Sequence, residues 1–159
     1  MGLWARAEVP RASVSPKQKG KGVSAALAPD QQKRLLATAR SMLDKAYAPF
    51  SEFLVGAAVL TRDGGIYSGC NVENWSYGLT ICAERAAIFA AVGAEGPEMK
   101  IHSIAVCARH QGRDHAASPC GACRQVIFEF GPEALVLYQG PSGLQQVSIS
   151  DLLPGGFRL

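Results

Sequence analysis

Three cysteines and one glutamate stand in two short clusters whose side chains could together bind a metal ion and move protons. In the first, Glu84 follows Cys82 by two residues, and in the second, Cys120-Gly-Ala-Cys123 places two cysteines three residues apart. A Cys-x-x-Cys pair alone is a weak signal, because redox pairs and half-sites of zinc ribbons share it. Cys120-Gly-Ala-Cys123 is therefore interpreted together with Cys82 and Glu84.

Both clusters follow residues that favour the start of a helix. Thr80 can cap a helix that has Cys82 in its opening turn, and Ser118-Pro119 opens one with Cys120 and Cys123 in its first turns. Helix N-termini stabilise anions, which favours thiolate over thiol, and thiolate is the form that binds metals. We therefore predict a zinc site made of the three cysteines.

A closed structural zinc site would need a fourth protein ligand. His102 falls in a predicted strand, whereas His110 and His115 fall in a polar segment from which either could reach the metal. Three ligands and an open position instead indicate a catalytic zinc that carries water. Glu84 is then the available general acid and base, and the alternative is a surface acid favoured by the helix dipole.

The net charge of +3 is unevenly distributed along the chain. Residues 1–28 hold five basic side chains against one acidic, whereas residues 29–159 hold 11 basic against 12 acidic. We interpret residues 1–28 as a disordered basic tail and residues 29–159 as one nearly neutral domain. This distribution favours neither a nucleic-acid partner nor a membrane surface, and no apolar run is suited to spanning a membrane.

The five cysteines are an odd number, and no secretion signal precedes them. Reduced thiols in the cytosol are the simplest interpretation, so we predict a cytoplasmic protein. The alternative is that the acid-poor N-terminal segment is an organellar presequence.

The remaining sequence predicts alternating helices and strands in a single domain. Apolar periodicity indicates a helix that Asp30 caps and Pro49 ends, and Asp63-Gly64 between two apolar runs is typical of a β-hairpin. The Ala-rich helix after Thr80 should be largely buried, since it has almost no polar face. The expected strands are 53–60, 66–71, 101–108, 134–138 and 144–150, and 109–118 is expected to be a polar loop. The short link between the last two strands permits only an antiparallel pair, so we expect one mixed sheet flanked by helices.

Cys82-Ala-Glu84 with Pro119-Cys-Gly-Ala-Cys-Arg-Gln125 resembles the signature of the zinc-dependent cytidine deaminases. Phe53-Leu-Val-Gly-Ala-Ala, Gly69-Cys-Asn-Val-Glu-Asn74, Tyr77 and the Leu-Leu-Pro near the end resemble the branch that acts on free nucleosides, so the likeness covers about residues 29–157. It implies a three-layer α-β-α fold of the α/β class, with a five-stranded mixed sheet whose last two strands are antiparallel.

The resemblance also implies a reaction, which is the hydrolytic deamination of cytidine and 2′-deoxycytidine to uridine and 2′-deoxyuridine in pyrimidine salvage. One zinc ion per subunit would be held by Cys82, Cys120 and Cys123, and zinc-bound hydroxide would attack C4 of the base. Glu84 would carry the proton to N3 and then to the amino group that leaves as ammonia.

Further roles are implied for residues around this centre. Arg85 would offset the negative charge of zinc with three thiolates, although it could instead pair with Glu84. Taken alone, Phe53 could as well be a core residue, and Asn71 and Glu73 could simply end a strand. The family likeness places Phe53 and Ala83 at the base and Asn71 and Glu73 at the ribose, and in a homotetramer with shared pockets it brings Tyr77 and Phe157 from neighbouring subunits.

Two alternatives remain open from the sequence. A deaminase of polynucleotides or of a nucleoside antibiotic could use the same zinc core, although polynucleotide deaminases usually have their last two strands parallel. A non-enzymatic module could instead use zinc only to fold.

Overall fold

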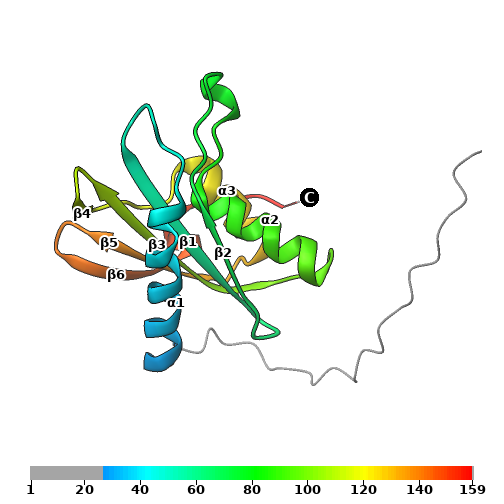
Figure 1. Cartoon of the computed structure of the whole chain (residues 1–159). Coiled ribbons are helices and arrows are strands. Elements are labelled where there is room, and N and C mark those ends of the chain that lie inside the picture. Colours follow the sequence, from blue (N-terminus) through cyan, green and yellow to red (C-terminus); the bar gives the residue numbers. More distant parts are fainter. Residues whose placement is uncertain (1–26, 159) are drawn as a thin grey trace, which may run out of the picture.

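The computed structural model describes residues 27–158 (Figure 1). The predicted basic tail of residues 1–28 therefore lies outside the described residues except for its last two positions. Leu27 is buried, and it packs in the core beneath the first helix.

A mixed β-sheet forms the centre of the domain, with the strand order β2-β1-β3-β5-β6. Its strands are β1 (Phe53–Thr61), β2 (Ile66–Cys70), β3 (Ile101–His110), β5 (Leu135–Gly140) and β6 (Gly143–Ser148). β1 is antiparallel to both β2 and β3, β3 and β5 are parallel, and β5 and β6 are antiparallel. The predicted α/β class, the mixed sheet and the antiparallel final pair are thus confirmed, as is the hairpin at Asp63-Gly64.

A sixth strand, β4 (Arg113–His115), pairs antiparallel with the end of β3. The prediction of a polar loop is therefore wrong for residues 109–115, and the sheet has six strands instead of the predicted five. Gln111 and Gly112 make the turn, with φ of 49° and 75°. Positive φ at both central residues is the backbone geometry of a two-residue hairpin turn, which the sequence indicates only through Gly112.

Helices cover both faces of the sheet, which gives the expected three layers (Figure 1). α1 (Pro29–Ser41) packs on one face, and α2 (Ala83–Glu95), α3 (Gly121–Phe130) and the short α4 (Ile149–Leu152) pack on the other. α1 begins at Pro29, with Ala28 rather than Asp30 as its N-cap, and it ends at Ser41, well before Pro49. A 3₁₀-helix, η1 (Leu43–Lys45), follows it, and another, η2 (Tyr77–Leu79), lies in the loop before α2.

α2 and α3 each begin two residues later than the sequence predicts. Cys82 is the N-cap of α2 and Cys120 is the N-cap of α3. Ile81 exchanges two backbone hydrogen bonds with Val72, which keeps the chain extended up to the first cysteine. Ala117 N–H donates to the carbonyl of Gln139 in β5, which ties the segment before the second cysteine to the sheet in the same way.

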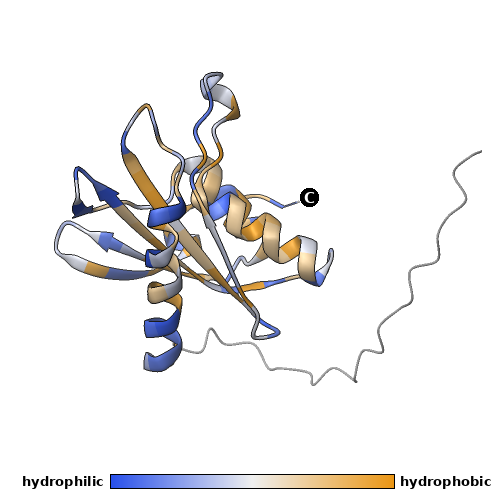
Figure 2. Cartoon of the chain, in the orientation of Figure 1, coloured by the Kyte–Doolittle hydropathy of each residue, from blue (hydrophilic) through white to orange (hydrophobic). Residues whose placement is uncertain are grey.

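The Ala-rich helix α2 lies very close to the sheet. A Cβ atom added at Gly69 in β2 would come within 2.5 Å of the Ala87 nitrogen, so only glycine allows this approach. The outer side of α2 is nevertheless apolar and uncovered (Figure 2), and Phe89 on it is 52% exposed. The prediction that α2 is largely buried is therefore correct only for the side that faces the sheet.

No helix among residues 27–158 is both long and apolar enough to cross a membrane.

Candidate active site

The three cysteines predicted to bind zinc converge where α2 and α3 begin. Their sulfur atoms all lie within 4.8 Å of one another, and the sulfurs of Cys82 and Cys120 are 3.9 Å apart. A tetrahedral zinc with Zn–S bonds of about 2.3 Å requires sulfurs about 3.8 Å apart. The cluster therefore has the donor atoms and the spacing to hold zinc. Among residues 27–158, neither His110 nor His115 joins it.

One thiol of the cluster, Cys82, is predisposed to lose its proton. The hydrogen bond from the Cys123 thiol, supported by Arg85, lowers the pKa of Cys82 to about 5. The same shared proton and burial raise the pKa of Cys123, which is thus the donor of the pair. A divalent cation would replace these protons, because metals bind the deprotonated sulfur.

Glu84 lies in the first turn of α2 beside this cluster, and it is only 4% exposed. Burial in the protein interior is the main reason that its pKa is raised above the ordinary value, and the Cys82 thiolate adds to the effect. The alternative of a surface acid at a helix start is therefore wrong. A buried carboxyl with a raised pKa is suited to receiving and releasing a proton.

Arg85 is directed at the sulfur cluster and not at Glu84. Its Nη2 donates to the carbonyl of Thr80 at 3.1 Å and lies 3.7 Å from the Cys82 sulfur. The hydrogen bond to Cys82 raises the pKa of the guanidinium. Within the described part of the chain, Arg85 forms no ion pair with Glu84, so its positive charge is available to offset the thiolates.

A cavity of about 180 Å³ opens in front of Glu84, Cys82 and Cys120. Of the predicted substrate contacts, Phe53, Asn71 and Ala83 lie in its wall, whereas Glu73, Tyr77 and Phe157 do not. The wall also contains residues that the sequence did not single out as substrate contacts. These are Val55, Thr80, Val106, Ala117 and Ser118. Thr80 and Ser118 shortly precede the two cysteine motifs, and this position was the signal that could have identified them.

Comparison with known proteins assigns this arrangement to a family. The model of the cytidine and deoxycytidylate deaminase zinc-binding region matches residues 29–139. The chain belongs to this family. It is 44% identical over 126 residues to a cytidine deaminase of Sporosarcina psychrophila, a match that covers 78% of this chain and 89% of that protein.

Solved structures of the deaminase family agree with the fold. The structure of cytidine deaminase from Mycobacterium tuberculosis superposes with a TM-score of 0.69 at 39% identity, covering 80% of this chain and 98% of that one. The structure of cytidine deaminase from Burkholderia pseudomallei gives the same TM-score at 43% identity, with 79% and 98% covered. The chain is thus a zinc-dependent enzyme of the deaminase family, and the predicted fold class is confirmed.

Asn71 and Glu73 have structural partners in this deaminase. The Asn71 side chain is buried, accepts from the Val55 N–H at 2.8 Å and donates to the Phe53 carbonyl at 2.9 Å. Glu73 accepts from the Phe50 N–H at 2.8 Å and from the Ser51 hydroxyl and N–H, and mainly the hydroxyl lowers the pKa of its carboxyl. Both residues hold the loops around the cavity, and Asn71 also faces it.

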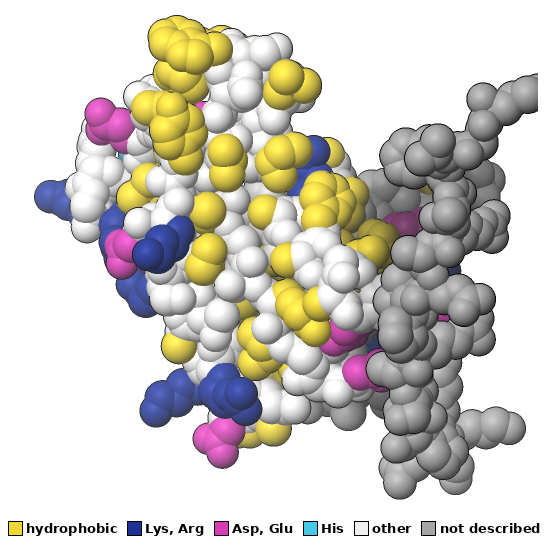
Figure 3. Space-filling view, turned by 45° about the vertical axis from the view of Figure 1, so that its right-hand side comes forward, with side chains coloured by type: hydrophobic (Ala, Val, Ile, Leu, Met, Phe, Trp, Pro, Cys, Tyr) yellow, Lys and Arg dark blue, Asp and Glu magenta, His cyan; other side chains and the backbone are white. Residues whose placement is uncertain are grey.

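Tyr77 and Phe157 point outward and are 76% and 66% exposed. Tyr77 begins η2, and its ring contacts that of Phe50 with a centroid distance of 6.3 Å. The loop between β2 and α2, which contains η2, projects beyond the sheet (Figure 1). Hydrophobic side chains gather at one end of the molecule and continue over the face shown in Figure 3. The large exposed hydrophobic residues include Trp75, Tyr77, Leu79, Phe89 and Phe157.

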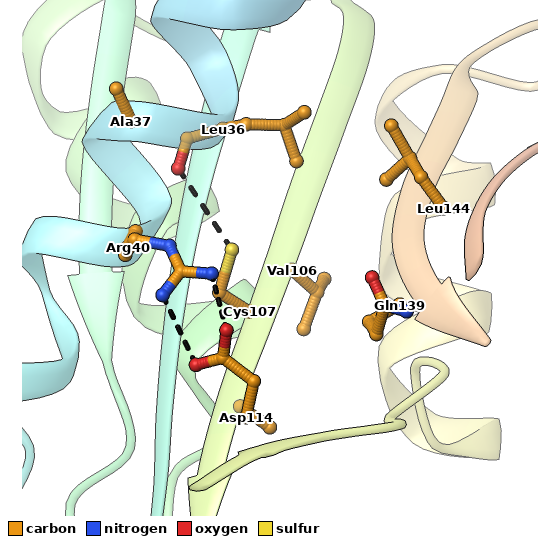
Figure 4. A pocket seen from close by; sticks show the side chains of 9 residues that line it. Leu36, Ala37, Arg40, Val106, Cys107, Asp114, Gln139 and Leu144 are labelled. Atoms are coloured by element: carbon orange, nitrogen blue, oxygen red, sulfur yellow. Dashed lines mark hydrogen bonds and ion pairs between the residues drawn. The ribbon is translucent and has the colours of Figure 1, made fainter. Parts of the chain in front are cut away.

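A second cavity of about 390 Å³ lies between α1 and strands β3 to β6 (Figure 4). An ion pair of Arg40 with Asp114 stands at its edge, and the Cys107 thiol is directed at the Leu36 carbonyl. Burial raises the pKa of Cys107, so this sulfur is a neutral thiol and a poor nucleophile at neutral pH. The smaller cavity, which combines a buried acid with a metal-binding cluster, is therefore the candidate active site.

Proposed function

We propose that this chain is a cytidine deaminase, which hydrolyses cytidine and 2′-deoxycytidine to uridine and 2′-deoxyuridine and releases ammonia. The observation that carries the proposal is the buried carboxyl of Glu84, which lines one cavity together with Cys82 and Cys120 of the three-cysteine cluster. The relatives named cytidine deaminase support the choice of substrate.

Cys82, Cys120 and Cys123 hold one zinc ion per subunit in this proposal. When bound, zinc lowers the pKa of a coordinated water so that hydroxide is available near neutral pH. Two helix N-termini and the Arg85 guanidinium lie against the sulfurs and counter the negative charge of three thiolates.

Glu84 moves the protons of the reaction. It takes one proton from the attacking water and delivers it to N3 of the base. It then takes the proton of the new C4 hydroxyl and passes it to the amino group, which leaves as ammonia as the C4–N bond breaks and the C4 carbonyl forms. The burial that raises its pKa favours the protonated carboxyl, which is the form that passes a proton to the base.

Residues in and around the wall hold the nucleoside. Phe53 and Ala83 line the cavity and contact the base, while Asn71 has one amide hydrogen beyond the one that it donates to Phe53 and can offer it to the ribose. Glu73 reaches the ribose from the rim, although Phe50 and Ser51 already hold its carboxylate.

The cavity of one subunit is smaller than most ligand pockets, which span about 300–1,000 Å³. We infer that neighbouring subunits of a homotetramer complete it with Tyr77 and Phe157. The exposed hydrophobic residues around them support an interface, because such large patches are rare on monomers. Sedimentation of a fully active monomer would contradict this assembly.

Two further points belong to the proposal. Three ligand thiols must stay reduced to bind zinc, which supports a cytoplasmic location.

The antiparallel pairing of β5 and β6, together with the nearly neutral domain, supports a free nucleoside over a polynucleotide as substrate.

The test measures ammonia release from cytidine, 2′-deoxycytidine and cytosine-containing single-stranded DNA, with zinc content determined on the same preparation. We expect turnover of both nucleosides with about one zinc per chain. Deamination of DNA alone would overturn the choice of substrate, and zinc-loaded protein that converts none of the three would overturn the proposed activity.

A further inference from the structure

Two histidines surround the aromatic residue in the cavity wall. The ring of Phe53 lies 5.2 Å from that of His115 at an interplanar angle of 77°, and 5.8 Å from that of His110 at 41°. The two imidazoles are themselves 6.2 Å apart and nearly perpendicular. These distances fall in the range of favourable aromatic pairs, so the three rings form one cluster at the edge of the cavity.

The sheet register creates this cluster. Phe53 at the start of β1 pairs with His110 at the end of β3, and the turn at Gln111-Gly112 folds β4 back so that His115 pairs with Ala108. His110 and His115 thus come from two strands of one hairpin, although Phe53 is more than fifty residues away in the sequence.

The position of His115 is fixed from both sides. Its Nδ1 lies 2.9 Å from the Ala116 carbonyl, to which the Nδ1–H donates, and Ala117 after it lines the cavity and is bonded to β5. On the other side, the Asp114 carboxylate takes two hydrogen bonds from Arg40 of α1, which anchors β4 to the helix (Figure 4).

We infer that His110 and His115 are positioning residues, which hold the Phe53 ring in the orientation that receives the base. This inference rests on the proposed contact between Phe53 and the nucleoside. Phe53 is only half-buried and lines the cavity, so one side of its ring is open. The edge-to-face contact with His115 and the tilted contact with His110 restrict the rotamer before substrate arrives and reduce the ordering cost of binding.

The test compares steady-state kinetics of His115→Leu and His110→Leu with those of the unchanged protein. We expect KM for cytidine to rise about three- to tenfold in each variant, the range that the loss of an aromatic pair allows. kcat should stay within about twofold, because neither ring touches Glu84 or the cysteines, and zinc content should not change. His115→Phe keeps the ring contact and should restore KM.

Arg113→Leu is the matched control, since Arg113 lies in the same hairpin, opposite His110, but its side chain is exposed and is not an aromatic ring. We expect its KM to be unchanged. If Arg113→Leu raised KM as much as the histidine variants do, the hairpin and not the imidazoles would be responsible, and the inference would be wrong. Equal losses of kcat and zinc in His115→Leu would overturn it in the same way.

Combination with Phe53→Leu separates this inference from the proposed function. If the histidines act through Phe53, His115→Leu has no further effect on KM once Phe53 is replaced, so the double variant resembles Phe53→Leu. Effects that multiply would overturn the positioning role while leaving the base contact intact. An unchanged KM in Phe53→Leu itself would overturn the base contact, and the positioning role with it.

Discussion

Replacement of Glu84 by glutamine tests the proposed chemistry most directly. Glutamine keeps the size and hydrogen-bonding shape of the side chain but cannot exchange a proton in the reaction. A positioned acid or base typically contributes a factor of about 10² to 10⁴, and Glu84 serves two successive transfers, so we expect kcat to fall about 10⁴-fold. This corresponds to about 5 kcal/mol of transition-state stabilisation.

The fold should tolerate this change. Burial raises the pKa of Glu84, which means that the fold disfavours the charged carboxylate, and a neutral amide avoids that cost. We therefore expect the Glu84→Gln variant to retain about one zinc per chain and to melt at or slightly above the temperature of the unchanged protein.

The assay follows the loss of cytidine absorbance alongside metal analysis and thermal melting. Glu95→Gln is the matched control, because Glu95 is a half-buried glutamate at the other end of α2 that accepts from the Thr61 hydroxyl at 2.9 Å. Its kcat should stay within about twofold even if its stability falls. A zinc-loaded Glu84→Gln protein with a kcat near that of the control would refute the proton-transfer role.

Three other measurements test the structure around this centre. Gly69→Ala in β2 should lower the free energy of unfolding by about 1–3 kcal/mol, because the new Cβ would press on α2. Gly93→Ala on the open side of α2 is the control and should not lower it. Equal melting temperatures of the two variants would contradict the close packing of β2 and α2. Asp114→Asn should cost less than about 1 kcal/mol at neutral pH, since its pair with Arg40 is exposed. The hydrogen bond from Arg40 lowers the pKa of Asp114, so the stabilisation by this ion pair is present above the ordinary pKa of an aspartate and disappears as acid protonates the carboxylate. If urea titration in acid found the same loss of unfolding free energy in Asp114→Asn as at neutral pH, the ion pair would not be its source. Removal of zinc by a chelator should abolish turnover and lower the melting temperature, and zinc should restore both; turnover by metal-free protein would show that the reaction does not need the cluster.

Local sequence signals were sufficient for the metal site and most of the sheet. Cys82-x-Glu84 and Cys120-x-x-Cys123 each combine a helix start with donor atoms, so their chemistry could be interpreted without knowledge of the fold. The Asp63-Gly64 turn and the short link between β5 and β6 likewise restrict the chain to antiparallel pairs. In each case the decisive residues lie within a few positions of one another.

The cavity rim could not be predicted in this way, because it depends on contacts between distant segments. Glu73 is tied to Phe50 and Ser51 across more than twenty residues, and the histidines reach Phe53 only through the register of β1 and β3. The strand β4 could not be predicted for the same reason. Its turn places Gln111 at positive φ, where glycine or asparagine is usual, and the ion pair to Arg40 that holds the strand is invisible in the sequence.

The two-residue shift in the start of both helices explains the spacing of the cysteine motifs. With Cys120 as N-cap, Cys123 becomes the third helical residue, and side chains at these two positions meet over the free N–H groups of the first turn. With Cys82 as N-cap, Glu84 is the second helical residue and stays beside the sulfur without replacing it as a ligand. Had the helices begun at Thr80 and Ser118, Cys120 would be the second helical residue and Cys123 the fifth, so the two sulfurs would no longer stand at the N-cap and third positions that meet over the free N–H groups. The extended segments that delay both helices therefore determine whether the same residues form a metal site.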